Sequence, residues 1–144
     1  MKKFILPLVG AAALAAGAYV ALKPEPAPLA LSSKPAEGAP IVDVVLPDAL
    51  SANAQIGKRA FDAVCAECHG ENAAGREAFG PPLVHIIYEP SHHGDMSFVM
   101  AAQRGVQAHH WRFGNMPPQE GVTPADVKAI ITYVRELQRA NGIN

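Results

Sequence analysis

The sequence predicts an all-α domain with long loops, on three observations. Apolar residues recur at helical spacing over residues 52–68 and again over residues 123–140. No stretch shows the sustained alternation of apolar and polar residues that is typical of a strand. Glycine and proline recur through residues 69–94 and 105–122, which leaves little room for regular structure there. We therefore expect three or four helices joined by long loops.

The first 22 residues form a segment of their own. Lys2 and Lys3 precede an uncharged run over residues 4–22. At about 1.5 Å per residue, this run just crosses a hydrocarbon core of roughly 30 Å. It is rich in alanine and glycine, and residues 16–18 (Ala-Gly-Ala) look like a small-residue cleavage site. Residues 1–22 are thus a signal peptide or a membrane anchor, and in both cases the rest of the chain is exported.

Residues 23–47 have the composition of a Pro/Ala-rich linker. Six of the 13 prolines in the chain fall in this stretch. Because proline fixes φ and removes a backbone donor, we expect neither a helix nor a strand here. Residues 48–144 are then left as the globular domain.

Two helices are expected in the first part of this domain. The first covers residues 52–68, with Ser51 as its N-cap. Its interior glycine, Gly57, costs about 1 kcal/mol relative to alanine. Close approach by another helix would explain why a glycine is tolerated there. A shorter helix covers residues 96–104, with Asp95 as its cap.

The strongest helix signal is at the C-terminus. Thr123 as N-cap, Pro124 in the first turn and Asp126 three residues after the cap form an N-terminal signature. The stripe expected to be buried consists of Val127, Ile130, Ile131, Val134 and Leu137. A domain this small with so much loop has a thin core, so a large apolar cofactor is expected to fill its centre.

Cys65 and Cys68 are the only cysteines, and His69 follows directly. Four interpretations compete. Structural zinc needs about four ligands, and only one thiol pair is present. A thioredoxin-type dithiol needs a strand-to-helix context, and a disulfide at this spacing would constrain the unfolded chain little. In the fourth, the thiols add to the vinyl groups of a haem and His69 coordinates its iron. For an exported chain without other cysteines, covalent haem c is the favoured interpretation.

The iron would need a second axial ligand. The candidates are Met96, Met100, Met116, His85, His92, His93, His109 and His110. Met116 stands in a short loop next to Pro117 and Pro118, where no helical period assigns it to a core. A thioether held by a stiff loop suits low-spin iron, whereas Met100 suits the ordinary task of filling a core.

These residues resemble those of class I (mitochondrial-type) cytochromes c, most closely the small exported bacterial mono-haem cytochromes. The resemblance covers about residues 52–140. Cys65, Cys68 and His69 match the haem-attachment motif. The glycine and aromatic of the family's first helix and the aromatic of its last helix are matched by Gly57, Phe61 and Tyr133. The resemblance implies the cytochrome c fold around one covalently bound haem c, with single-electron transfer as its task.

Two further matches concern the iron ligands. Gly80-Pro81-Pro82-Leu83 is similar to the family's Gly-Pro-x-Leu, in which the proline carbonyl orients the proximal histidine. By that match Pro81 orients His69. Met116 matches the distal methionine, so the resemblance implies His69 and Met116 as the axial ligands.

Residues 84–94 and 107–113 are richer in histidine and aromatics than the family pattern requires. Trp111, Arg112 and Tyr88 are candidate hydrogen-bond donors to the haem propionates. The two histidine pairs are either loop residues or a copper or zinc site. These pairs are His92 with His93 and His109 with His110. Core packing is the alternative for Trp111.

The expected function is that of an electron carrier rather than an enzyme. With 12 basic and 13 acidic side chains, nothing marks the chain as a nucleic-acid binder. We expect transient docking of redox partner proteins, no small-molecule substrate, and a place on the periplasmic side of a bacterial inner membrane. Residues 4–22 would provide any membrane contact. The alternatives are a haem-based sensor or peroxidase-like protein with a weak distal ligand, a metal-handling protein, or a subunit of a larger oxidoreductase.

Overall fold

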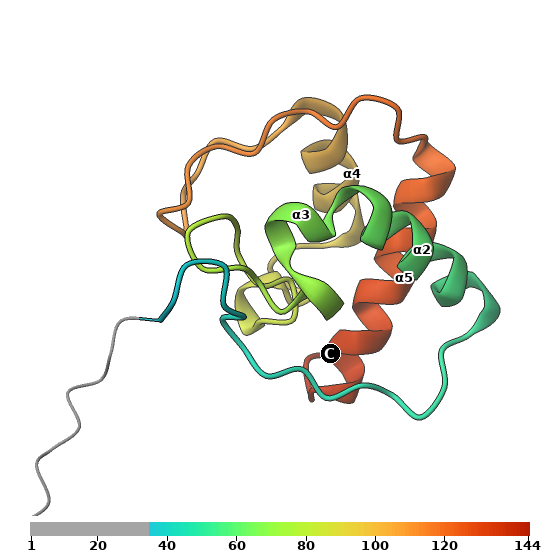
Figure 1. Cartoon of the computed structure of the whole chain (residues 1–144). Coiled ribbons are helices and arrows are strands. Elements are labelled where there is room, and N and C mark those ends of the chain that lie inside the picture. The colour runs from blue at the N-terminus through green and yellow to red at the C-terminus, as the bar shows by residue number, and fades with distance from the viewer. Residues whose placement is uncertain (1–34) are drawn as a thin grey trace, which may run out of the picture. The chain divides into compact units, whose positions relative to one another are not determined.

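The computed structural model describes residues 35–144, which form one compact unit (Figure 1). The expected signal peptide or anchor at residues 1–22 and the first part of the expected linker lie outside these described residues. The elements are α2 (Ala52–Val64), α3 (Ala66–His69), η1 (Glu71–Ala73), η2 (Ile86–Tyr88), α4 (Asp95–Arg104) and α5 (Pro124–Ala140). Over this range there is no strand, only two isolated β-bridges, so the all-α prediction is confirmed. No helix within residues 35–144 is long and apolar enough to cross a bilayer.

Helices α2 and α5 cross at Gly57. A Cβ atom added to this glycine would lie 1.9 Å from the backbone oxygen of Ala129 in α5. One turn further along α2, the ring of Phe61 packs against that of Tyr133, with centroids 5.6 Å apart. Both rings are fully buried. The close helix crossing expected from the interior glycine is therefore confirmed.

The helix predicted over residues 52–68 divides at Cys65. Ser51 caps α2 as predicted, since its hydroxyl accepts from the Ala54 N–H at 3.2 Å. Cys65 keeps a right-handed helical conformation (φ −88°, ψ −32°), so the interruption between α2 and α3 is slight. Ile56 is 49% exposed, so this apolar side chain does not belong to the buried face of α2. The face that α5 covers carries Ala54, Gly57 and Phe61.

Helix α5 follows its sequence signals closely. Thr123 and Asp126 form the capping box, with the Thr123 hydroxyl accepting from the Asp126 N–H and the Asp126 carboxylate accepting in return. Pro124 occupies the first turn. The predicted stripe is buried throughout: Val127, Ile130, Ile131, Val134 and Leu137.

Helix α4 starts one residue earlier than predicted. Its N-cap is Gly94, and Asp95 is the first helical residue rather than the cap. The Asp95 carboxylate accepts a hydrogen bond from Arg135 Nε at 2.9 Å instead. It thus links α4 to α5.

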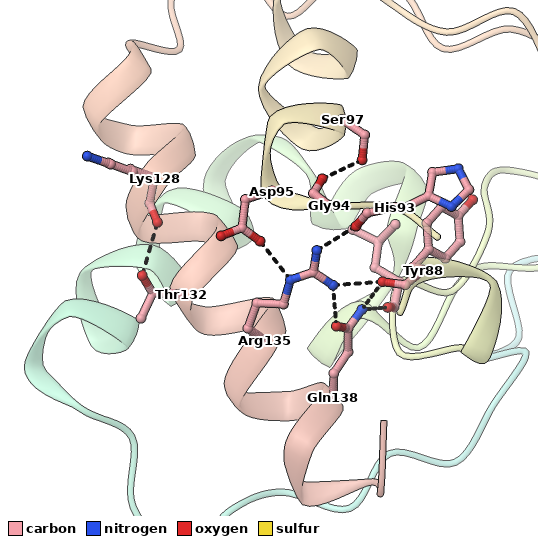
Figure 2. Close-up of polar contacts among 10 residues, drawn as sticks. Tyr88, His93, Gly94, Asp95, Ser97, Lys128, Thr132, Arg135 and Gln138 are labelled. Atoms are coloured by element: carbon pink, nitrogen blue, oxygen red, sulfur yellow. Dashed lines mark hydrogen bonds and ion pairs between the residues drawn. The ribbon is translucent and has the colours of Figure 1, made fainter. Parts of the chain in front are cut away.

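Arg135 and its neighbour Gln138 fasten the loop before α4 to α5 (Figure 2). The guanidinium of Arg135 donates to the carbonyl oxygens of Tyr88 at 2.7 Å and His93 at 2.5 Å. Gln138 accepts from Arg135 at 2.6 Å and donates to the Tyr88 carbonyl at 3.0 Å. Both side chains are buried, so the network supplies the partners that buried polar groups require.

Residues 35–47, the second part of the expected linker, pack on the domain. The N–H groups of Ile41 and Val42 both donate to the Ala74 carbonyl at 3.1 Å. The side chain of Asn141 exchanges two hydrogen bonds with the backbone of Val45. The segment forms no helix or strand, as its prolines predict, yet the compact unit begins upstream of the expected boundary at residue 48.

Candidate functional site

A cavity of about 730 Å³ lies at the centre of the described unit. It is lined from the end of α2 and from α3, from α4 and α5, and from the loops between them. Much of the lining is apolar, including Val64, Leu83, Phe98, Met100, Val106, Phe113, Val127 and Ile130. Its volume falls in the range of roughly 300–1,000 Å³ that is usual for cofactor and ligand sites. The cofactor that the thin core predicts therefore has a space to fill.

The two cysteines and His69 all line this cavity. Both thiols are free; Cys65 is half-buried and Cys68 is exposed. Burial raises the pKa of Cys65 to about 11, and the neighbouring Cys68 adds to the rise. A reactive dithiol needs a depressed pKa, so this environment argues against the thioredoxin-type interpretation.

His69 is oriented by a single backbone contact. Its Nδ1 lies 2.9 Å from the carbonyl oxygen of Pro81. Because a carbonyl can only accept, Nδ1 carries the proton and Nε2 keeps a free lone pair. Burial lowers the pKa of His69, against a smaller opposing contribution from the Pro81 hydrogen bond, and so favours the neutral imidazole.

The loop that carries Pro81 is held close to α3. A Cβ atom on Gly80 would lie 2.7 Å from the backbone oxygen of Cys68, so only glycine allows this approach. The Gly-Pro pair thus brings the proline carbonyl to the histidine ring.

Met116 lines the same cavity from the loop between α4 and α5. The two arms of this loop run side by side (Figure 1), joined by reciprocal hydrogen bonds between the backbones of Met116 and Val106 at 2.9 and 3.0 Å. Gly105, with φ +73°, permits this pairing, since a Cβ there would lie 2.4 Å from the Met116 oxygen. Met100 also lines the cavity, whereas Met96 is 68% exposed and does not.

The three expected propionate donors differ in position. Trp111 and Tyr88 line the cavity, and Arg112 is exposed and does not. The indole Nε1 of Trp111 is buried without a hydrogen-bond partner. Burial raises the pKa of Tyr88 to about 12, and Trp111 opposes this slightly, although the indole makes no well-formed hydrogen bond.

Comparison with known proteins decides the family. Residues 54–138, more than half of the chain, match the family described as Cytochrome c. This chain belongs to the cytochrome c family. Membership implies that the cytochrome carries covalently bound haem c and serves haem-based electron transfer.

One curated relative is the Cbb3-type cytochrome c oxidase subunit CcoP of Rubrivivax gelatinosus, which is 37% identical over 87 residues. The aligned part is 59% of this chain and 26% of that protein, so the cytochrome spans about a quarter of its relative's length. No solved structure matches the cytochrome.

The cavity of this cytochrome fits a haem. Its walls are largely apolar, and the unpartnered Trp111 Nε1 offers a donor to a buried anionic group. Leu83, Phe98 and Phe113 line the cavity, whereas the nearby apolar residues Ile86, Ile87 and Val99 do not. Ile86 is 58% exposed.

Two residues that support the site were not predicted from the sequence. These residues are Arg135 and Gln138, both buried polar side chains of α5. Their spacing could have indicated that they are buried. Arg135 follows Ile131 by four residues and Gln138 follows Val134 by four, which places both on the side of the helix that carries the apolar stripe. Polar residues at buried helical positions need partners, and here those partners are backbone groups of the Tyr88 loop.

Proposed function

We propose that this cytochrome c is a single-electron carrier in which Cys65 and Cys68 hold haem c, while His69 and Met116 ligate its iron. One observation carries the proposal. The four side chains line one apolar cavity, and His69 is already oriented by Pro81. When bound, the haem supplies one-electron cycling of its iron between two oxidation states.

The residues of α3 provide the attachment. Cys65 and Cys68 would hold the haem through two thioethers, each formed when a thiol S–H adds across one vinyl group. Cys65 is a neutral thiol at neutral pH because burial raises its pKa to about 11, and the thioether that it would form is neutral as well. The Pro81 carbonyl leaves His69 Nε2 free to bind iron.

Met116 and the apolar wall favour the reduced state. A thioether ligand raises the reduction potential, and a site with low dielectric disfavours the added charge of ferric iron. Two backbone hydrogen bonds between Val106 and Met116 hold the loop that presents the thioether. A fixed sixth ligand also keeps small molecules from the iron, which separates a carrier from a sensor or a peroxidase.

Trp111 and Tyr88 serve the haem propionates in this proposal. Trp111 Nε1 is a buried donor without a partner, and Tyr88 stays protonated at neutral pH because its pKa is about 12. Each offers one hydrogen bond to a carboxylate. Arg112 has no contact with the cavity that would support the same role.

The distal ligand is tested by two matched methionine substitutions. Met116→Ala is expected to lower the reduction potential and to allow rapid carbon monoxide binding to the ferrous protein. Met100→Leu, at a methionine that lines the same cavity from α4, should change neither. Equal spectra and potentials for Met116→Ala and the wild type would rule out Met116 as the distal ligand. A loss of low-spin character only in Met100→Leu would identify Met100 as that ligand.

The partner is proposed to be a membrane respiratory complex. The likeness to an oxidase subunit supports a place near a terminal oxidase, as a mobile donor or as a bound subunit. The side chain of Cys68 is exposed, so a docking partner would meet the attachment segment on that side. We further propose that the domain is exported to the periplasmic side of a bacterial inner membrane and that residues 4–22 are either cleaved or retained as an anchor.

Fractionation of the producing cells tests the location and the partner together. The full chain should reach the periplasmic fraction or the membrane with its domain outward, and it should exchange electrons with a membrane oxidase. Mild detergent extraction separates the two cases, because a bound subunit stays with the oxidase and a mobile donor does not. Haem-free protein in the cytoplasm would contradict the export. A failure to reduce or oxidise any membrane oxidase would contradict the proposed partner, but it would not bear on the proposed iron ligands.

A further inference from the structure

Four imidazoles meet at one place on the surface. We refer to His92, His93, His109 and His110 as the histidine cluster. The ring centroids lie 4.5 Å apart within the first pair and 4.3 Å apart within the second. Between the pairs, His110 lies 5.2 Å from His92 and 5.3 Å from His93. Two loops separated by α4 thus bring all four rings together.

The donor atoms are spaced for a shared ion. One nitrogen each from His92, His93 and His110 lies within 4.8 Å of the other two. Around a zinc ion with Zn–N bonds of about 2.0–2.1 Å, ligand nitrogens are roughly 3.3–3.4 Å apart. His92 and His110 are exposed, so small side-chain rotations can close the difference. His109, whose ring lies against His110, can supply a fourth nitrogen.

Two of the rings are already oriented by backbone carbonyls. Nδ1 of His93 lies 2.6 Å from the Ile87 oxygen, and Nδ1 of His109 lies 2.9 Å from the Gln107 oxygen. As a carbonyl can only accept, each Nδ1 carries the proton and each Nε2 keeps its lone pair. This is the outer-shell arrangement that metal-binding histidines usually show.

The ligand set of the cluster consists of imidazoles. The group of converging ligand atoms found within the described residues contains no carboxylate. Imidazole nitrogens without oxygen donors suit transition metals such as copper and zinc.

We propose that the histidine cluster binds one divalent transition-metal ion, Cu²⁺ or Zn²⁺. Imidazole is a preferred ligand of both ions, whereas Mg²⁺ and Ca²⁺ require oxygen ligands. His93, His109 and His110 also line the central cavity, so this second metal would lie at the edge of the haem site. The site uses none of the proposed iron ligands, and it stands whether Met116 or Met100 is the distal ligand.

The test uses the holoprotein without an affinity tag, treated with a chelator and then titrated with CuCl₂ or ZnCl₂ by calorimetry. The iron content, measured by mass spectrometry, gives the amount of haem in the sample. We expect one added metal ion per iron for at least one of the two metals. Copper should show nitrogen hyperfine structure in its electron paramagnetic resonance spectrum. His92→Asn and His110→Asn should each weaken binding about tenfold or more, the scale seen even for outer-shell partners of metal ligands.

A matched control is His85→Asn, which removes an imidazole outside the cluster. The Asn oxygen can still accept from the Ile87 N–H, as His85 Nδ1 does at 3.2 Å. This variant should bind the metal as the wild type does. Unchanged haem spectra will show that each variant is folded. The proposal is overturned if neither ion binds stoichiometrically, or if both cluster variants bind with wild-type affinity.

Discussion

The substitution Gly57→Ala tests the helix crossing that positions the haem-attachment segment. A methyl group at this position would lie 1.9 Å from the backbone oxygen of Ala129, and ordinary contacts begin near 3.4 Å. A backbone oxygen cannot rotate away, so α2 and α5 would have to separate by about 1.5 Å. The packing of Phe61 on Tyr133 lies next to the crossing and would be loosened as well.

The magnitude follows from two opposing terms. Replacing an interior helical glycine with alanine gains about 1 kcal/mol when nothing obstructs the methyl group. Overpacking a tight interface costs about 1–3 kcal/mol or more, and a backbone clash belongs at the upper end. The free energy of unfolding should therefore fall by roughly 2 kcal/mol, which lowers the midpoint temperature by about 10 °C for a domain near this size.

Guanidinium unfolding of the ferric holoprotein, followed by far-ultraviolet circular dichroism, measures this change. Ala63→Gly at an exposed position of the same helix serves as the control, because it isolates helix propensity and should cost about 1 kcal/mol. A Gly57→Ala variant that is as stable as the wild type, or more stable, would refute the close crossing.

Two further predictions concern α5. Arg135→Met should lower the free energy of unfolding by about 2–3 kcal/mol, because it removes the donor to the His93 carbonyl and one of the two donors to the Tyr88 carbonyl. Chemical denaturation measures this loss, and a loss below the error of the fit would contradict the network. The pKa of Asp126 is lowered by hydrogen bonds from the Thr123 hydroxyl and backbone. A depressed folded-state pKa stabilises the domain above the unfolded-state value and loses that contribution as the pH falls below about 4. Asp126→Asn should therefore lose less stability than the wild type between pH 5 and pH 2, and parallel pH profiles would count against the capping box.

The sequence predicted α5 well because every signal there is local. The capping pair Thr123 and Asp126, the proline that follows the cap and the apolar stripe all lie within one helix. The close crossing at Gly57 was also predictable, since a glycine that weakens a helix interior indicates a neighbouring backbone that leaves no room for a methyl group. The exposure of Ile56 was not predictable, because periodicity alone does not say which side of a helix its partner will cover.

The loops were harder to predict because distant partners determine them. Arg135 holds the Tyr88 loop through backbone carbonyls, which no sequence pattern specifies. The convergence of the two histidine pairs depends on how α4 separates their loops, so the sequence supports a shared site only as an alternative. The attachment motif differs from the loops, because Cys65, Cys68 and His69 are close in sequence and must lie close in space.

One optical experiment tests the central claim most directly. The full chain is produced in an exporting host that matures c-type cytochromes, and its spectrum is recorded before and after acid–acetone extraction and with carbon monoxide added to the reduced protein. We predict that the porphyrin stays on the polypeptide and that the low-spin ferrous spectrum does not change with carbon monoxide. A colourless protein or a porphyrin that extracts freely would contradict the attachment of haem through two thioethers. Prompt carbon monoxide binding would contradict an iron that is ligated by both His69 and Met116.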